Sequence, residues 1–219
     1  MTASPPAGIL VSDYDGTLTR HDFFEIACTE LVPPGTPDYW GEFLAGKWTV
    51  FEVLEKIFAA IRSDEATVLD AARRCVIDPE AGPLIRRLQQ AGWEVQIASA
   101  GCHWYIDRLL AERKIEIEVF ANPGEFRAGE GLLLQRNVGA PHYAPATGID
   151  KAAIVQAALE RCERVAVAGD GAPDFAAASL VPESRRFARA TLARKLTAAG
   201  MGYRPFERWA EVAEALLAE

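Results

Sequence analysis

Four aspartates lie in two short glycine-containing segments that each follow an apolar run: Asp13 and Asp15 after residues 8–11, Asp170 and Asp174 after residues 165–168. Short apolar runs that end in acidic residues and glycine are typical of buried strands leading into a loop. In a doubly wound sheet the carboxyl ends of the strands meet at the ligand crevice, so both loops are expected at one point. Two carboxylates ~4 Å apart repel by about 4 kcal/mol at an effective dielectric near 20. A cation is therefore expected between them, and Mg²⁺ is the usual one where phosphates are handled.

Two further polar residues are placed to reach the same crevice. Ser99 is predicted to end a strand over residues 93–99, so that its hydroxyl and the backbone N–H groups that follow, from Ala100 onward, could bind an oxyanion. Lys151 opens a helix predicted over residues 150–161, and a lysine near a helix N-terminus is unfavourable unless an anion lies close by. The sequence thus indicates a site for a divalent cation and a phosphate group.

The remaining pattern alternates strands and helices. A further strand is expected over residues 117–120 and a hairpin over 125–134, with helices over 83–90, 103–113, 190–199 and 206–218. Strands that alternate with helices of this length predict an α/β fold, with a doubly wound parallel sheet covered on both faces.

Residues 20–77 interrupt this alternation with a block of predicted helices, over 22–31, 38–45, 49–61 and 64–75. Ser63 is the expected N-cap of the last helix. Phe23, Phe24, Trp40 and Trp48 suggest a partly apolar lid. We therefore expect an inserted helical cap at residues 20–77 and a core domain made of residues 7–19 and 78–219.

Composition excludes several other classes of protein. The 219 residues are half apolar and carry a net charge of −8, so the chain lacks the basic surface that duplex nucleic acid requires. No apolar run approaches the ~20 residues that span a bilayer, and no signal peptide is visible, so no membrane partner is expected. The four cysteines and three histidines show no zinc-binding spacing. A reducing cytoplasm is the expected location.

The order of the motifs is DxD after the first strand, serine after the second, then lysine, then GDxxxD, across residues 9–174. This order resembles the four-motif signature of the haloacid dehalogenase (HAD) superfamily. Each motif is weak alone, but four in sequence, each at a strand end or a helix start, are specific. The resemblance implies a Rossmann-like α/β core and a Mg²⁺-dependent phosphatase that hydrolyses a small-molecule phosphate monoester.

The resemblance also implies a role for each matching residue. Asp13 would be the nucleophile that forms an aspartyl-phosphate, and Asp15 the general acid and then base. Mg²⁺ would be held by the Asp13 carboxylate, the Asp15 backbone carbonyl and Asp170, with Asp174 as a further or more distant ligand. Ser99, Ala100 and Lys151 would bind the phosphoryl oxygens.

The helical block after the first motif resembles the C1-capped, phosphoserine phosphatase-like branch of the superfamily. Phosphoserine phosphatases carry a glutamate nine residues after the nucleophile and an arginine in the cap, where this chain has Asp22 and Ile57. Those departures argue against phosphoserine as the substrate. Segments such as DYDGTLTRHDFF and the region around residues 43–58 are more similar to the methionine-salvage 2-hydroxy-3-keto-5-methylthiopentenyl-1-phosphate phosphatases and their relatives.

Several alternatives stay open. A phosphoserine phosphatase or a phosphomutase would use the same site, and a phospho-accepting signalling domain is a non-enzymatic alternative. Chain length and motif order argue against the signalling domain. The sequence leaves open whether the chain is a monomer or a homodimer, and it assigns no role to His103 and His142.

Overall fold

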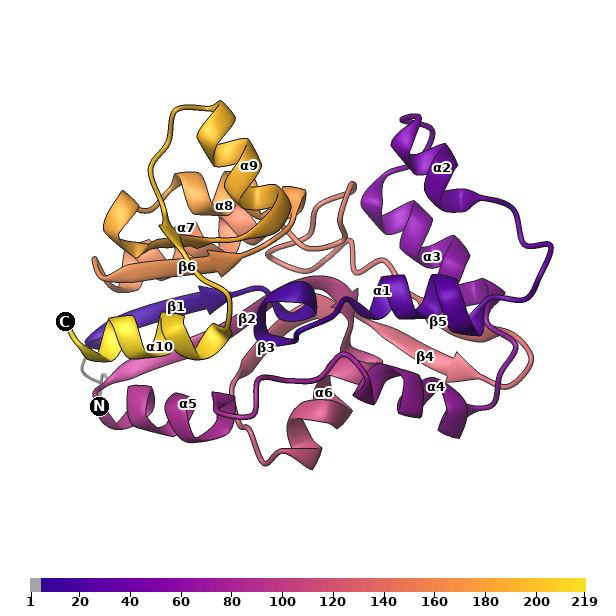
Figure 1. Cartoon of the computed structure of the whole chain (residues 1–219), viewed down its shortest axis with the longest axis horizontal. Coiled ribbons are helices and arrows are strands. Elements are labelled where there is room, and N and C mark those ends of the chain that lie inside the picture. Colours follow the sequence, from indigo (N-terminus) through magenta and orange to yellow (C-terminus); the bar gives the residue numbers. More distant parts are fainter. Residues whose placement is uncertain (1–4) are drawn as a thin grey trace.

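A six-stranded parallel sheet lies at the centre of the molecule, in the order β3-β2-β1-β6-β7-β8 (Figure 1). The computed structural model describes residues 5–219. The strands are β1 (Gly8–Ser12), β2 (Trp93–Cys102), β3 (Glu118–Asn122), β6 (Val165–Gly169), β7 (Arg186–Ala188) and β8 (Arg204–Pro205). Strand order reverses direction between β1 and β6, the position at which open α/β sheets bind ligands. The predicted doubly wound α/β fold is confirmed.

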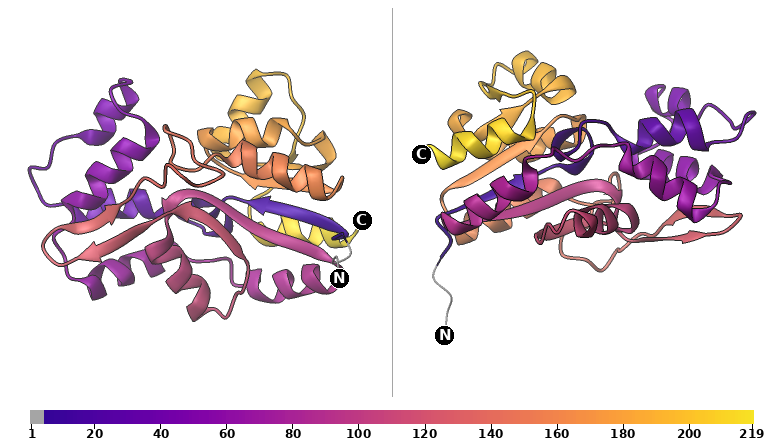
Figure 2. Two further views of the ribbon diagram at one scale, coloured as in Figure 1. Left: turned by 180° about the vertical axis from the view of Figure 1, so that it is seen from behind. Right: turned by 60° about the horizontal axis from the view of Figure 1, so that its bottom comes forward.

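Helices cover both faces of this sheet (Figures 1 and 2). One face packs against α5 (Ala81–Gln90), α6 (His103–Glu112) and α10 (Trp209–Leu217), and the other against α7 (Lys151–Arg161), α8 (Phe175–Ser179) and α9 (Ala190–Ala198). Successive residues of a strand point to opposite faces, so Leu10 joins the first core while Ile9 and Val11 join the second. Burial on both faces explains the continuous apolar run of β1.

The segment 20–77 is helical, as predicted, and projects beyond the carboxyl edge of the sheet (Figure 1). Its helices are α1 (Phe23–Ile26), continued by a wider helical turn at Ala27–Leu31, α2 (Tyr39–Leu44), α3 (Val50–Ala60) and α4 (Glu65–Arg73). The two connections to the sheet lie side by side, because Thr19 and Ile77 form an antiparallel bridge. The division of the chain into a cap and a core domain stays a prediction.

A separate hairpin, β4 (Gly124–Arg127) with β5 (Gly131–Leu134), was expected from its turn residues and is confirmed. The hairpin packs against α3 of the 20–77 segment, with Gly131 beside the carbonyl oxygens of Phe58 and Ile61. The hairpin and α3 are far apart in the sequence, and no sequence pattern predicted that they would be in contact.

Two local predictions need correction, and two strands were missed. Asp64, not Ser63, caps α4, since its carboxylate accepts a hydrogen bond from the Thr67 amide at 2.8 Å. Strand β2 does not end at Ser99 but continues to Cys102, which pairs with Asn122. The short strands β7 and β8 were not predicted. No helix within residues 5–219 combines the length and apolar character needed to cross a membrane.

Candidate active site

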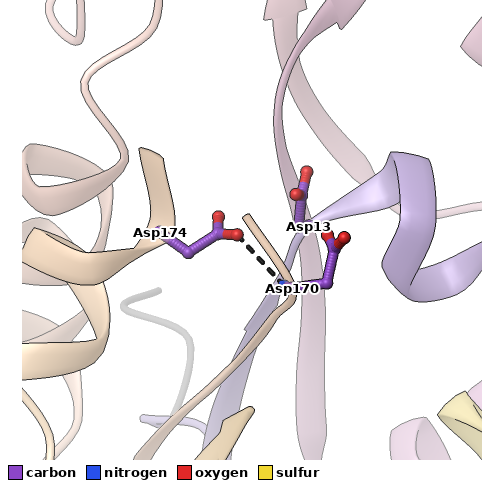
Figure 3. A group of neighbouring side chains, drawn as sticks. All are labelled: Asp13, Asp170 and Asp174. Atoms are coloured by element: carbon purple, nitrogen blue, oxygen red, sulfur yellow. Dashed lines mark hydrogen bonds between the residues drawn. The ribbon is translucent and has the colours of Figure 1, made fainter. Parts of the chain in front are cut away.

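Three carboxylates converge where β1 and β6 end. Asp13 follows β1 directly, Asp170 follows β6, and Asp174 lies in the next turn (Figure 3). Asp13, Asp170 and Asp174 each offer an oxygen within 4.8 Å of the oxygens offered by the other two. The parallel pairing of the two strands sets this arrangement, because the Asp13 amide donates to the Ala168 carbonyl at 2.9 Å. The predicted meeting of the two acidic loops is therefore observed.

Lys151 lies within the same cluster. Its side chain is buried, and Nζ lies 2.8 Å from Oδ1 of Asp13 and 2.6 Å from Oδ1 of Asp174. Burial acts to lower the lysine pKa, but the attraction of Asp13 and Asp174 outweighs it and raises that pKa above the ordinary value. The lysine is accordingly a permanent positive charge at this point.

Gly16 lets the first loop approach Asp170 closely. Its φ of +70° is the left-handed conformation that glycine adopts without strain, and a Cβ at this position would lie 2.6 Å from Oδ2 of Asp170. The next residue, Thr17, donates from its hydroxyl to Oδ1 of Asp170 at 3.1 Å. The glycine and the threonine of the first motif thus hold the carboxylate of the fourth.

Asp174 is occupied with the protein itself. Its Oδ2 accepts the backbone amides of Asp170 and Gly171 at 3.2 and 2.9 Å, and its Oδ1 accepts from Lys151 (Figure 3 marks the Asp170 contact). Both oxygens therefore have partners. Asp174 fixes the loop and the lysine, which suits the more distant ligand position expected from the sequence.

Asp13 and Asp170 have the free oxygens that a metal ion needs. Oδ1 of Asp13 accepts the Tyr14 amide at 2.7 Å and Oδ1 of Asp170 accepts Thr17, whereas Oδ2 of each has no hydrogen-bond partner among residues 5–219. Burial raises the pKa of Asp13 above its ordinary value and raises the pKa of Asp170 to about 6. Repulsion from the Asp174 carboxylate raises both pKa values further. An all-oxygen donor set with excess negative charge is the chemistry that suits Mg²⁺.

Asp15 is held apart from this cluster by Tyr105 on α6. The Tyr105 hydroxyl donates to Oδ2 of Asp15, and the Phe23 amide donates to Oδ1 at 3.3 Å. Burial raises the pKa of Asp15 to about 6, while the hydrogen bonds from Tyr105 and Phe23 act in the opposite direction. A carboxyl with such a pKa can both donate and accept a proton near neutral pH.

Ser99 and Ala100 lie in the second half of β2 and face the same space. Ser99 is buried, and its Oγ accepts the Gly101 amide at 2.9 Å. A hydrogen bond from the Ser99 side chain is also one of the contacts that act to lower the pKa of Asp15. There is no room for a side chain at position 101. A Cβ added to Gly101 would lie 2.0 Å from the Tyr105 hydroxyl and 2.7 Å from Oδ2 of Asp15. Gly101 is thus required for the contact between Tyr105 and Asp15.

These groups line a cavity of about 430 Å³ that also contacts the 20–77 segment. The sheet side carries Asp13, Asp15, Ser99, Lys151 and Asp170. The opposite wall also contains Asp22 and Glu25 but is mostly apolar. Its apolar side chains come from α1, α2 and α3: Phe24, Trp40, Phe43, Leu44, Val50, Val53, Leu54 and Phe58. Of the four aromatics expected in a lid, Phe24 and Trp40 line the cavity, while Phe23 packs on Tyr105 and Trp48 lies beneath Lys56.

Neither unassigned histidine lines this cavity. His103 pairs with Asp107 on the surface of α6, and His142 contacts the edge of the Phe120 ring. The sequence analysis missed Thr17 and Tyr105 as site residues. Thr17 could have been noticed as part of the DxDGT motif, but nothing in the sequence indicated that Tyr105 contacts a carboxylate 90 positions away.

Comparison with known families supports the grouping of these residues. The model of the haloacid dehalogenase-like hydrolases matches residues 10–179, which hold every residue of the cluster. The chain belongs to this family. It is thus an enzyme of the hydrolase and phosphatase group, and the resemblance seen in the sequence is confirmed.

Two curated relatives are distant but cover most of the chain. Both are 2-hydroxy-3-keto-5-methylthiopentenyl-1-phosphate phosphatases. The protein from Exiguobacterium sibiricum is 24% identical over 220 residues, covering 94% of this chain and 95% of the relative. The protein from Brevibacillus brevis is 22% identical over 175 residues, covering 78% and 79%. A substrate-bound phosphoserine phosphatase has the same fold, with a TM-score of 0.65 at 15% identity over 97% of this chain and 99% of that one.

Proposed function

We propose that this hydrolase is a Mg²⁺-dependent phosphatase that cleaves a small-molecule phosphate monoester through an aspartyl-phosphate on Asp13. One observation carries the proposal. Asp13, Asp170 and Lys151 converge at one end of a cavity whose other wall is apolar. A charged end suits a phosphate, and the remaining space suits the alcohol to which it is esterified.

Asp13, Asp170 and the Asp15 backbone carbonyl are the groups that would hold Mg²⁺, with Asp174 behind them. The free Oδ2 atoms of Asp13 and Asp170 support this assignment. A bound Mg²⁺ neutralises the carboxylates and the phosphoryl oxygens, which would otherwise repel one another. Phosphoryl transfer depends chiefly on such positioning and charge neutralisation.

Asp13 is the nucleophile in this proposal. Lys151 and the Tyr14 amide both bind its Oδ1, which fixes the orientation of the carboxylate. Attack of a carboxylate oxygen on phosphorus forms the acyl phosphate as the bond to the ester oxygen breaks. The Ser99 hydroxyl, the Ala100 amide and the Lys151 ammonium are the donors proposed for the phosphoryl oxygens.

Asp15 is the proposed general acid and base. It gives its proton to the leaving alcohol oxygen, and the resulting carboxylate then takes a proton from the water that hydrolyses the acyl phosphate. The pKa of about 6 supports both steps, because neither protonation state is strongly disfavoured near neutral pH.

The test is phosphate release from a panel of small phosphate esters with the full chain. Wild-type protein is expected to release inorganic phosphate only with Mg²⁺, and EDTA is expected to abolish the release. The panel includes 2-hydroxy-3-keto-5-methylthiopentenyl-1-phosphate, named for both curated relatives. Asp13→Asn should lower kcat by at least about 10⁴-fold, since an amide cannot form the acyl phosphate. Isomerisation of a sugar phosphate without phosphate release would instead show a phosphomutase.

A further inference from the structure

The wall opposite the carboxylates carries no cationic side chain. The 20–77 segment contains six lysines and arginines (Arg20, Lys47, Lys56, Arg62, Arg73 and Arg74), and none of them lines the cavity. Lys56 lies over the Trp48 ring at 4.1 Å, and Lys47 binds Glu42 at 2.7 Å. Among residues 5–219, Lys151 is the only lysine or arginine in the lining, and it is already shared by Asp13 and Asp174.

Two further acidic residues belong to the cavity lining. Asp22, which caps α1, and Glu25 on α1 line the cavity together with Phe24. The Asp22 carboxylate accepts the Phe24 amide at 2.7 Å and has no cationic partner among residues 5–219. Burial, together with repulsion from Asp15, raises the pKa of Asp22 well above its ordinary value and so favours its neutral form. A second anionic group on the substrate would therefore be repelled chiefly by Glu25, with no lysine or arginine of the wall to offset that repulsion.

Aromatic and aliphatic side chains make up the rest of this wall. The Phe24 and Trp40 rings lie 4.8 Å apart and the Trp40 and Phe43 rings 5.0 Å apart, which forms one continuous apolar surface with Leu54 and Phe58. Each methylene group of a ligand that is buried against such a surface makes the binding free energy more favourable.

We infer that the enzyme selects phosphate esters whose organic part is apolar and carries no carboxylate. The inference rests on the proposed function, because it assigns the alcohol side of the same cavity. Apolar contact attracts the organic group, while Glu25 and the lack of a cationic side chain on this wall disfavour a carboxylated one, so specificity has both an attractive and a repulsive component. Phosphate esters of hydroxyl-bearing amino acids or of hydroxy acids, which keep a free carboxylate, are therefore expected to be poor substrates.

The experiment uses the full chain with Mg²⁺ and measures kcat/KM for two sets of esters. The first is the series from ethyl to hexyl phosphate, in which each added methylene should raise kcat/KM by about threefold until the wall is covered. The second is a matched pair, pentyl phosphate and 4-carboxybutyl phosphate, and the carboxylated ester should be at least about tenfold poorer. A flat alkyl series, or equal use of the pair, would overturn the inference. Absence of phosphate release from every ester would contradict the proposed function instead.

Two substitutions locate the effect. Leu44→Arg places a cation on the wall at a side chain that is 68% exposed, so the fold should tolerate it. The carboxylated ester should then improve by roughly tenfold relative to pentyl phosphate. Glu25→Gln removes the charge of the other acid in the lining, so it should move the ratio in the same direction. Val138→Arg, at a 69% exposed position outside the cavity, is the control and should leave the ratio unchanged. An unchanged ratio in both test variants would show that the organic group does not contact this wall.

Discussion

At the scale of single residues, the site depends on which carboxylate oxygens of the four aspartates accept hydrogen bonds from neighbouring groups and which do not. Asp174 uses both oxygens within the protein, while Asp13 and Asp170 each keep one free. Asp15 is drawn away from the cluster by Tyr105. Four residues of one type thus receive different chemistry from their hydrogen-bond partners.

Tyr105→Phe tests whether the tyrosine positions Asp15 for proton donation. Loss of the hydroxyl should lower kcat for alkyl phosphates by about 10- to 100-fold, because their leaving alkoxide needs a proton. Hydrolysis of 4-nitrophenyl phosphate should change by less than about twofold, since nitrophenolate leaves without one. Steady-state kinetics with both substrates provide the measurement.

A purely structural role for Tyr105 would lower both rates equally, and that result would refute the positioning role. Tyr203→Phe is the matched control. Its hydroxyl lies 3.4 Å from Thr197 Oγ1 and outside the cavity lining, so neither rate should change.

At the scale of secondary-structure elements, the buried strands and amphipathic helices were predictable because their apolar periodicity is strong. Strands β7 and β8 were missed because they are short and contain arginine. Arg186 is nevertheless buried, and its guanidinium donates to the carbonyls of Ala178, Val181 and Gly202. Those partners lie in α8 and in two separate loops, and no local pattern reveals them.

The contact between the β4–β5 hairpin and α3 can be tested with two glycines of the same turn. Both have positive φ, +81° at Gly129 and +94° at Gly131, but an added Cβ meets nothing within 4 Å at Gly129 and lies 2.4 Å from the Phe58 oxygen at Gly131. Gly129→Ala should cost about 1 kcal/mol of unfolding free energy from backbone strain alone. Gly131→Ala should cost about 2 kcal/mol more, because the backbone of α3 must move.

Denaturant unfolding of the two variants measures this difference directly. Equal losses at Gly129 and Gly131 would mean that the hairpin does not pack against α3 as the structure shows.

At the scale of the whole molecule, segments that are distant in the sequence contribute residues to one site around Asp13. Asp13, the proposed nucleophile, follows β1, and Lys151 begins α7. The Trp209 indole of the last helix donates to the hydroxyl of Ser12, the residue before Asp13, at 3.1 Å. The sequence predicted that the four motifs would converge, because parallel strand ends meet at one edge. It could not predict Tyr105 as the partner of Asp15, since side-chain contacts across elements depend on packing.

Crowded carboxylates should make the stability of the metal-free protein depend on pH. The pKa of Asp170 is raised from 3.8 to about 6 in the folded chain, so its favourable protonated form is present below about pH 4 and is lost as pH rises through 6. The pKa of Asp13 is raised in the same direction. Metal-free protein should therefore lose stability between pH 4 and 7.

Mg²⁺ should reverse that loss, because it binds the ionised carboxylates. Free Mg²⁺ at about 100 times its Kd adds about 2.7 kcal/mol, which is roughly 5–10 °C in Tm for a chain of this size. Thermal unfolding near pH 7.5 should show this shift, with a smaller one near pH 5. Asp170→Asn should abolish the Mg²⁺ response, and an equal or larger shift at pH 5 would contradict the assignment of these ligands.

The most direct measurement is to trap and locate the phosphoenzyme. Full-length protein is mixed with a cleaved ester and Mg²⁺, quenched in acid within the first turnover, and its peptides are mapped by mass spectrometry. We expect phosphate on the peptide that contains Asp13, dependent on Mg²⁺ and absent from Asp13→Asn. Phosphate on another residue, or release of phosphate with no labelled enzyme at any time, would contradict the mechanism.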